Sequence, residues 1–284
     1  FFFQADEGIR DPLWSRGLGD VYKRQVCDYG FCKVEGAPGS AQEADRLVEL
    51  VGTKRITHYG DFELSNKKMS NTPDDIATLT EKDSINNVGD IRQALQPHCD
   101  ETYRTSTIGI TIFQVFEPST EGGHPTLVDG FEAARRFHKE FPDDFEELVR
   151  TPLTGQRFDP KHAEGELPRW YRCTLPMIRL DEDQEVCGIR VNERQIAPID
   201  LPYDQVVPTY RALQKFLKIV YDPSLMISFP LTKGDSLIFN NQRVLHGRTA
   251  VSYTHLRAHE TREDRGWRGR GEKKRGGGGG GGGG

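Results

Sequence analysis

Two residues in the segment HCDETY (98–103) have the types and spacing to bind a metal ion. His98 and Asp100 form a His-x-Asp pair. On a strand, residues i and i+2 project to the same side, so both side chains could reach one metal while Cys99 points away. The pair therefore predicts two ligands of a metal site.

Two similar pairs show how often this spacing arises by chance. They are His138-x-Glu140 and His162-x-Glu164. The first lies on a predicted helix, where i and i+2 point in nearly opposite directions. The second lies in a polar loop with no predicted strand beside it. Neither is favoured as a chelating pair.

A third ligand must come from elsewhere in the chain, and His246 is the candidate. It lies in FNNQRVLHGR (239–248), a strand-like segment that follows a tight turn at Gly234. Two histidines and one carboxylate are the ligand set of non-haem iron(II) oxygenases. They leave three positions open, two for a chelating 2-oxo acid and one for O₂. Spacing alone leaves open that His98 and His246 are ordinary histidines, with His246 packed under a turn.

Composition excludes several classes of protein. Of 284 residues, 29% are charged and 35% hydrophobic, which predicts a globular protein with a buried core. No apolar run approaches the roughly 18 residues of a membrane span, and no secretory signal is recognised. The five cysteines form no Cys-x-x-Cys pair, so we expect free thiols in a reducing compartment. We therefore expect an intracellular protein, cytoplasmic or mitochondrial, without a membrane partner.

The two ends differ from the rest of the chain. Residues 1–25 show no helical or strand periodicity, and residues 251–284 end in nine consecutive glycines. Both resemble sequencing-adapter DNA translated in frame, so we expect artefactual or disordered flanks around a core at 26–250 that is truncated at its C-terminus. This core has a net charge of −9, because the C-terminal flank carries eight Lys/Arg against four Asp/Glu and the N-terminal flank carries equal numbers. Such an acidic core argues against a nucleic-acid partner, although an Arg/Gly tail that binds nucleic acid is the alternative reading of residues 251–284.

The core predicts many short strands with helices inserted between them. We expect helices at 42–51, 129–140, from Pro142 and at 203–220, a long loop at 61–88, strands at 108–116, 126–128, 226–231, 236–239 and 243–248, and a hairpin of 171–180 with 186–192. The order has no alternation of strand and helix typical of a parallel sheet. A mainly β sandwich or barrel with helical insertions is therefore the predicted fold class.

Three segments together resemble the TauD/TfdA family of Fe(II)/2-oxoglutarate dioxygenases. They are HCDETY (98–103), GGHPTLVDGF (122–131) and FNNQRVLHGR (239–248), and VPTYRAL (207–213) and IRVN (189–192) fit the γ-butyrobetaine and trimethyllysine hydroxylase branch in order and spacing. The resemblance runs from about Cys27 to Arg248. It implies a double-stranded β-helix, the jelly roll shared with cupins.

The resemblance also implies the chemistry. Iron(II) would be held by His98, Asp100 and His246, with 2-oxoglutarate as cosubstrate and ascorbate as reductant. No catalytic side chain is implied beyond these ligands. The partners would be a small-molecule substrate and O₂, and a homodimer is left open. The alternative is a cupin-like metal-binding β protein without turnover.

Two positions depart from the family pattern for the cosubstrate. An Arg that clamps its distal carboxylate would fall in the adapter-like tail, where His259 stands at about the expected place. A Ser or Thr that assists would align with Pro125, and Thr126 is one place out of step, which on a strand turns a side chain to the other face. We keep Thr126 as a cosubstrate-binding candidate. We expect the chain as printed to bind 2-oxoglutarate weakly and to be inactive, although the parent protein should bind it.

Substrate recognition is implied at four further positions. The carnitine-synthesis enzymes hold a trimethylammonium group between aromatic faces. Tyr59 and Tyr103 match aromatic positions of this branch, Asp90 stands where a Tyr is expected, and Asn192 lies in IRVN. We expect an amine or quaternary-ammonium substrate. The alternative is that the two tyrosines only pack against the barrel.

Overall fold

Two four-stranded sheets form the body of the protein. The computed structural model describes residues 2–3, 16–36, 41–53, 55, 94–116, 118, 122–159 and 167–250. The first sheet has the order β1 (Phe2–Phe3), β2 (Phe31–Val34), β11 (Ser236–Asn240) and β4 (Ile110–Gln114). The second has the order β10 (Met226–Ser228), β5 (Pro125–Asp129), β12 (Val244–Arg248) and β3 (Leu95–His98). All pairs within them are antiparallel except β1 with β2.

An apolar core fills the space between the two sheets. Leu237 and Phe239 of the first sheet pack with Leu127 and Val244 of the second, together with Phe229. Neighbouring residues such as Ile238 and Leu245 belong to other clusters on the outer faces, as the period of two in a strand requires. The fold is the predicted double-stranded β-helix, or jelly roll.

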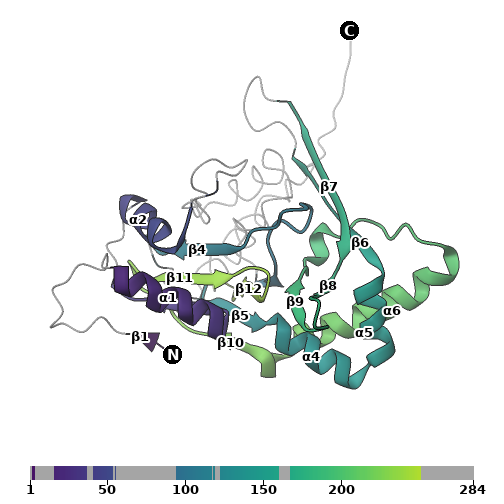
Figure 1. Cartoon of the computed structure of the whole chain (residues 1–284). Coiled ribbons are helices and arrows are strands. Elements are labelled where there is room, and N and C mark those ends of the chain that lie inside the picture. The colour runs from purple at the N-terminus through teal and green to yellow at the C-terminus, as the bar shows by residue number, and fades with distance from the viewer. Residues whose placement is uncertain are drawn as a thin grey trace, which may run out of the picture.

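Two helices lie against the outer face of the first sheet. They are α1 (Arg16–Tyr29) and α2 (Ala41–Val51), and α1 crosses in front of the strands in Figure 1. Tyr22 and Val26 of α1 pack with Cys32, Val34 and Ile238. Helix α2 confirms the prediction for 42–51. Helix α1 begins inside the N-terminal stretch for which the sequence predicted no element.

Three helices cover the outer face of the second sheet. They are α4 (Gly130–Glu140), α5 (Pro142–Arg150) and α6 (Tyr203–Val220), and all three were predicted. Phe137, Phe145 and Phe216 pack with Val128 and Leu245, which face outwards from β5 and β12. Pro142 starts α5 at a position where its missing N–H costs no helical hydrogen bond. No helix in the described part of the chain is both long and apolar enough to cross a membrane.

Two smaller hairpins complete the described fold. β6 (Pro152–Asp159) pairs with β7 (Arg169–Pro176) and extends away from the body in Figure 1, and β8 (Ile178–Leu180) pairs with β9 (Val186–Ile189). The short helices η2 (Glu193–Gln195) and η3 (Pro223–Leu225) follow. The predicted hairpin of 171–180 with 186–192 is thus only half correct, because residues 169–176 pair with a strand that the sequence did not indicate. The predicted loop at 61–88 lies outside the described residues.

One glycine allows the two strands that carry histidines to approach closely. Gly247 of β12 faces β3, and a Cβ atom on it would lie 2.3 Å from the Leu95 carbonyl oxygen and 3.0 Å from the Pro97 nitrogen. Both are backbone atoms, which cannot move aside as a flexible side chain can. The position therefore requires glycine.

We expect the substitution Gly247→Ala to lower the free energy of unfolding by about 2 kcal/mol or more, because β3 must move away from β12. Chemical denaturation of the variant and the parent protein measures this. Gly109→Ala is the matched control, since a Cβ there meets nothing within 4 Å. Equal losses for the two variants would contradict the close approach.

Candidate metal centre

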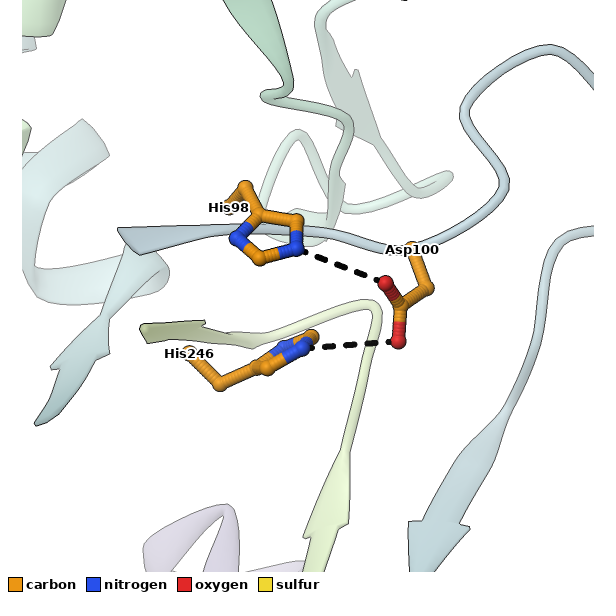
Figure 2. Close-up of side chains that lie close together, drawn as sticks. All are labelled: His98, Asp100 and His246. Carbon is orange, nitrogen blue, oxygen red and sulfur yellow. Dashed lines mark ion pairs between the residues drawn. The ribbon is translucent and has the colours of Figure 1, made fainter. Parts of the chain in front are cut away.

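Three potential metal ligands come together at one end of the space between the two sheets. They are His98, Asp100 and His246. Their ligand atoms all lie within 4.8 Å of one another. The Asp100 carboxylate lies between the two rings, with Oδ1 at 3.5 Å from His98 Nε2 and Oδ2 at 3.4 Å from His246 Nε2 (Figure 2). The three residues form the one cluster of potential metal ligands found among the described residues.

The pairing of β3 with β12 brings the two histidines together. His98 and His246 are directly opposite each other in the antiparallel register, and their ring centroids are 4.4 Å apart. Asp100 lies two residues beyond the end of β3, in a turn and not on the strand as predicted. Cys99 points away from the site as predicted, because its thiol donates to the Ile189 carbonyl on the outer side of the sheet.

The hydrogen bonds of His98 determine which ring nitrogen can bind a cation. His98 Nδ1 lies 2.9 Å from the Gln96 carbonyl oxygen, which can only accept. Nδ1 must therefore carry the proton, and the lone pair of the neutral ring is on Nε2, facing Asp100. A carbonyl that orients a ligating imidazole in this way is typical of metal sites.

His246 is buried among aromatic rings. The centroid of its ring lies 4.8 Å from that of Phe239 and 5.5 Å from that of Phe113. Only 6% of the residue is exposed. Burial lowers the pKa of His246 to about 4, against the opposing effect of Asp100 and with smaller contributions from His98 and Arg194. The ring is therefore neutral at physiological pH and able to donate a lone pair.

Asp100 supplies the negative charge of the site. Burial by itself raises the pKa of its carboxyl, but His246, His98 and Arg194 outweigh burial and hold the pKa well below its ordinary value. An ionised carboxylate thus faces Nε2 of both histidine rings. Oxygen and nitrogen lone pairs repel one another unless a cation lies between them, so the three groups fit a divalent metal ion.

Two buried asparagines fix the backbone of the turn that carries Asp100, which we call the metal-binding turn because it holds a predicted ligand. Asn241 accepts a hydrogen bond from the Asp100 N–H at 2.9 Å and donates to the Asp100 carbonyl at 3.2 Å. Asn192 donates to the Cys99 carbonyl at 3.2 Å. Side chains that hold ligands in this way contribute to metal affinity although they do not touch the metal.

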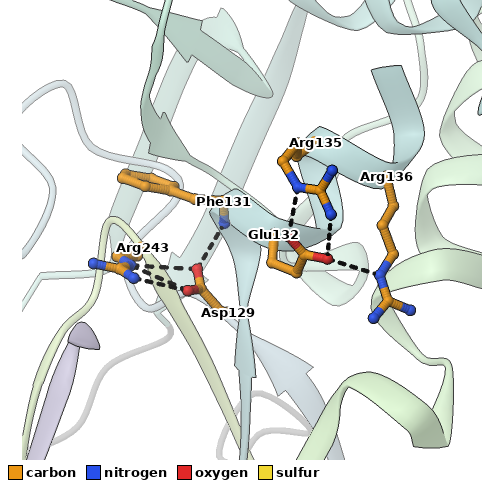
Figure 3. A network of polar contacts seen from close by, with 6 residues as sticks. All are labelled: Asp129, Phe131, Glu132, Arg135, Arg136 and Arg243. Carbon is orange, nitrogen blue, oxygen red and sulfur yellow. Dashed lines mark hydrogen bonds and ion pairs between the residues drawn. The ribbon is translucent and has the colours of Figure 1, made fainter. Parts of the chain in front are cut away.

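An ion pair beside the site fixes the start of β12. Arg243 binds Asp129 at 2.8 Å and also donates to the carbonyl groups of Cys27 and Asp28 in α1. Asp129 caps α4 by accepting from the Phe131 N–H, and Glu132 in the same helix binds Arg135 and Arg136 (Figure 3). The strand that carries His246 is therefore joined to helices on both sides of the jelly roll.

The structure places Thr126 away from the metal centre. In the register of β5 with β12, Leu127 lies opposite His246 and Thr126 opposite Gly247. Side chains of directly paired residues point to the same face of a sheet, so Leu127 shares the face of His246. Thr126, one position away, points to the other face. Its hydroxyl is buried and has no hydrogen-bond partner among the described residues. This register argues against a role of Thr126 in binding the cosubstrate at the metal centre.

The other predicted binding residues fall into two groups. Tyr103 is 2% exposed, with its ring 5.5 Å from that of Tyr171, and Asn192 is 2% exposed beside the metal-binding turn. Tyr59, Asp90 and His259 lie outside the described residues. The packing of Tyr103 favours the alternative reading, in which this tyrosine belongs to the core.

Two functional residues were missed by sequence reasoning. Asn241 stands in the quoted motif FNNQRVLHGR directly after β11, and an Asn at a strand end is a signal for a turn and not for a residue that supports a metal site. Arg194 lies close enough to Asp100 and His246 to affect the pKa of both. A single arginine outside every predicted helix and strand carries no spacing pattern that could have indicated this.

We expect His246 to make metal-free protein sensitive to acid. The folded state keeps the ring neutral down to pH about 4, whereas an unfolded imidazole binds a proton near pH 6.5. Between these values the unfolded state binds more protons, so stability falls as the pH falls. His246 should account for a loss of about 2 kcal/mol in unfolding free energy between pH 7.5 and pH 5.

Urea denaturation in the presence of a chelator at the two pH values measures this loss. The variant His246→Gln should lack it, and His138→Gln, which removes an exposed histidine of α4, should retain it. An equal loss in the parent protein and in His246→Gln would contradict the assignment.

Comparison with known proteins agrees with this geometry. The family described as "Taurine catabolism dioxygenase TauD, TfdA family" matches residues 4–266. A trimethyllysine dioxygenase of Meyerozyma guilliermondii is 31% identical over 229 residues, which cover 79% of this chain and 52% of that protein. A γ-butyrobetaine dioxygenase of a Pseudomonas species is 31% identical over 153 residues, which cover 54% of this chain and 38% of that protein.

A solved structure is similar in fold. PvcB, an Fe, α-ketoglutarate-dependent oxygenase, aligns with a TM-score of 0.51 and 15% identity over 82% of this chain and 75% of that one. The chain spans about half the length of the curated relatives it matches. With a family match over most of its length and a jelly roll of the same type, the chain belongs to the TauD/TfdA family of dioxygenases.

Proposed function

We propose that the protein is an Fe(II)- and 2-oxoglutarate-dependent dioxygenase that hydroxylates a small quaternary-ammonium compound. The observation that carries the proposal is the cluster of two imidazoles and one carboxylate whose ligand atoms lie within 4.8 Å of one another. This set matches the ligands of non-haem iron(II) oxygenases. The family to which the chain belongs supports the same chemistry.

The residues of the site bind and orient, and the bound group supplies the oxidation. When bound, iron with 2-oxoglutarate and O₂ provides the oxidising chemistry, in which the substrate gains one oxygen atom and succinate and CO₂ leave. His98 and His246 would hold the metal through Nε2, and Asp100 would neutralise part of its charge. Asn241 and Asn192 hold the turn that carries Asp100. No described side chain is required as a general acid or base.

The substrate class rests on the relatives. One relative is a dioxygenase of trimethyllysine and another of γ-butyrobetaine, and both compounds carry a trimethylammonium group and a carboxylate. We infer a substrate with the same groups. We further propose ascorbate as the reductant that keeps iron in the divalent state, and a mitochondrial compartment, because several related dioxygenases are mitochondrial.

A second candidate function is a metal-binding β protein without turnover. It is favoured by one observation at the expected cosubstrate site. Thr126 faces away from His246, and the position beside it on the inner face is Pro125, whose side chain has no donor. A protein of this kind would bind the divalent metal and leave 2-oxoglutarate unchanged.

Conversion of 2-oxoglutarate to succinate distinguishes the two functions. We expect succinate formation that depends on Fe(II) and rises with trimethyllysine or γ-butyrobetaine, and we expect its loss in His98→Ala and Asp100→Ala. Metal affinity should fall at least about tenfold in both variants, since each loses one ligand. His138→Ala serves as the control because its ring lies outside the site on α4.

The assay is made on the chain itself and on the chain extended to the length of its relatives. Bound iron without succinate in either form would contradict the dioxygenase and support the metal-binding alternative. Full metal affinity in His98→Ala would contradict the ligand assignment itself.

A further inference from the structure

Arg194 lies beside the metal centre and outside the ligand set. It belongs to η2 (Glu193–Gln195), which follows β9. Hydrogen bonds join the segment around η2 to the metal-binding turn on both sides of Asp100. The Cys99 N–H donates to the Val191 carbonyl at 2.6 Å, and the Thr102 hydroxyl donates to Gln195 at 2.9 Å. Arg194 is therefore held next to the turn that carries Asp100.

The charge of Arg194 reaches the metal ligands. Its guanidinium lies outside the triad and interacts electrostatically with the Asp100 carboxylate. Partial burial lowers the pKa of Arg194, and Asp100, Tyr221 and Glu193 act in the opposite direction. An arginine remains protonated under such conditions.

The donors of Arg194 are not used within the described part of the chain. No hydrogen bond or ion pair within contact distance joins its guanidinium to another described residue. The neighbouring carboxylate of Glu193 is instead bound by the Tyr221 hydroxyl. Arg194 is exposed to solvent, so a ligand can reach it.

A metal ion in the triad makes the surroundings of Arg194 more positive. Two neutral imidazoles and one carboxylate leave a divalent cation only partly neutralised, and the guanidinium adds a further positive charge. A planar guanidinium with free donors pairs best with a carboxylate, to which it can donate two parallel hydrogen bonds. The ligand that completes this site is therefore an anion.

We propose that Arg194 binds a carboxylate group of the small molecule that occupies the metal centre. The proposal rests on the proposed function, because it concerns the ligands of the same site. The carboxylate can come from the substrate or from the cosubstrate, and the chemistry at Arg194 is the same. Arg194 is then a determinant of specificity for anionic or zwitterionic ligands.

The test compares ligands with and without the carboxylate. Calorimetry on anaerobic Fe(II)-loaded protein measures the Kd of trimethyllysine and of its decarboxylated analogue, 5-aminopentyl-trimethylammonium. It also measures 2-oxoglutarate and 2-oxobutyrate, which lacks the distal carboxylate. The proteins are the parent, Arg194→Gln, Arg194→Lys and the control Arg211→Gln, which removes an exposed arginine of α6 that faces Asp144.

We expect Arg194→Gln to weaken the binding of one of the two parent ligands about tenfold or more and to leave the affinity of its analogue, which lacks the tested carboxylate, unchanged. Arg194→Lys should restore part of the loss, and Arg211→Gln should show none. A loss for trimethyllysine identifies the substrate as the source, and a loss for 2-oxoglutarate identifies the cosubstrate.

Equal affinities in the parent and Arg194→Gln would overturn the proposal, as would equal losses for ligands with and without the carboxylate. A parent protein that does not prefer either carboxylate ligand to its analogue would overturn it as well. Failure of the proposed function would look different. The protein would then form no succinate, while the differences in Kd between the parent and Arg194→Gln would persist.

Discussion

The pairing of β3 with β12 is the constraint on which the metal centre depends. It places His98 opposite His246, although 147 residues lie between them in the chain. Gly247 permits the approach, because any side chain there would meet the backbone of β3. Arg243 and Asp129 fix the start of β12, and Asn241 fixes the turn that follows β3. The ligands are thus positioned by rigid elements, as a site that must bind a metal without rearrangement requires.

The electrostatic state of the site follows from the same packing. Burial keeps His246 neutral, the Gln96 carbonyl selects the useful ring nitrogen of His98, and the two rings keep Asp100 ionised. At neutral pH, His246 can therefore bind a metal ion without first releasing a proton. Arg194 adds a positive charge beside the Asp100 carboxylate, and in our proposal it gives the site a preference for anionic ligands.

Much of the fold and the ligand set could be predicted from the sequence, since both rest on local patterns. The helices of 130–140, 142–150 and 203–220 show apolar spacing and start signals, and His98 with Asp100 shows chelating spacing. Strand β6 was missed because PLTGQRFD lacks a run of apolar or β-branched residues, and α1 because its flank was set aside. Thr126 was kept as a cosubstrate residue although a slip of one position reverses its face. The hydrogen bonds of Asn241 and the electrostatic interaction of Arg194 with Asp100 involve distant segments, and no local pattern encodes them.

The central claim is that His98, Asp100 and His246 together bind one metal ion, and X-ray absorption spectroscopy of the anaerobic Fe(II)-loaded protein tests it most directly. Imidazole rings give outer-shell scattering that carboxylates and water do not. The account predicts one tightly bound iron with two imidazole ligands in the parent protein, one in His246→Gln and two in His138→Gln. Iron bound only by light atoms without imidazole scattering, or an unchanged spectrum in His246→Gln, would contradict it.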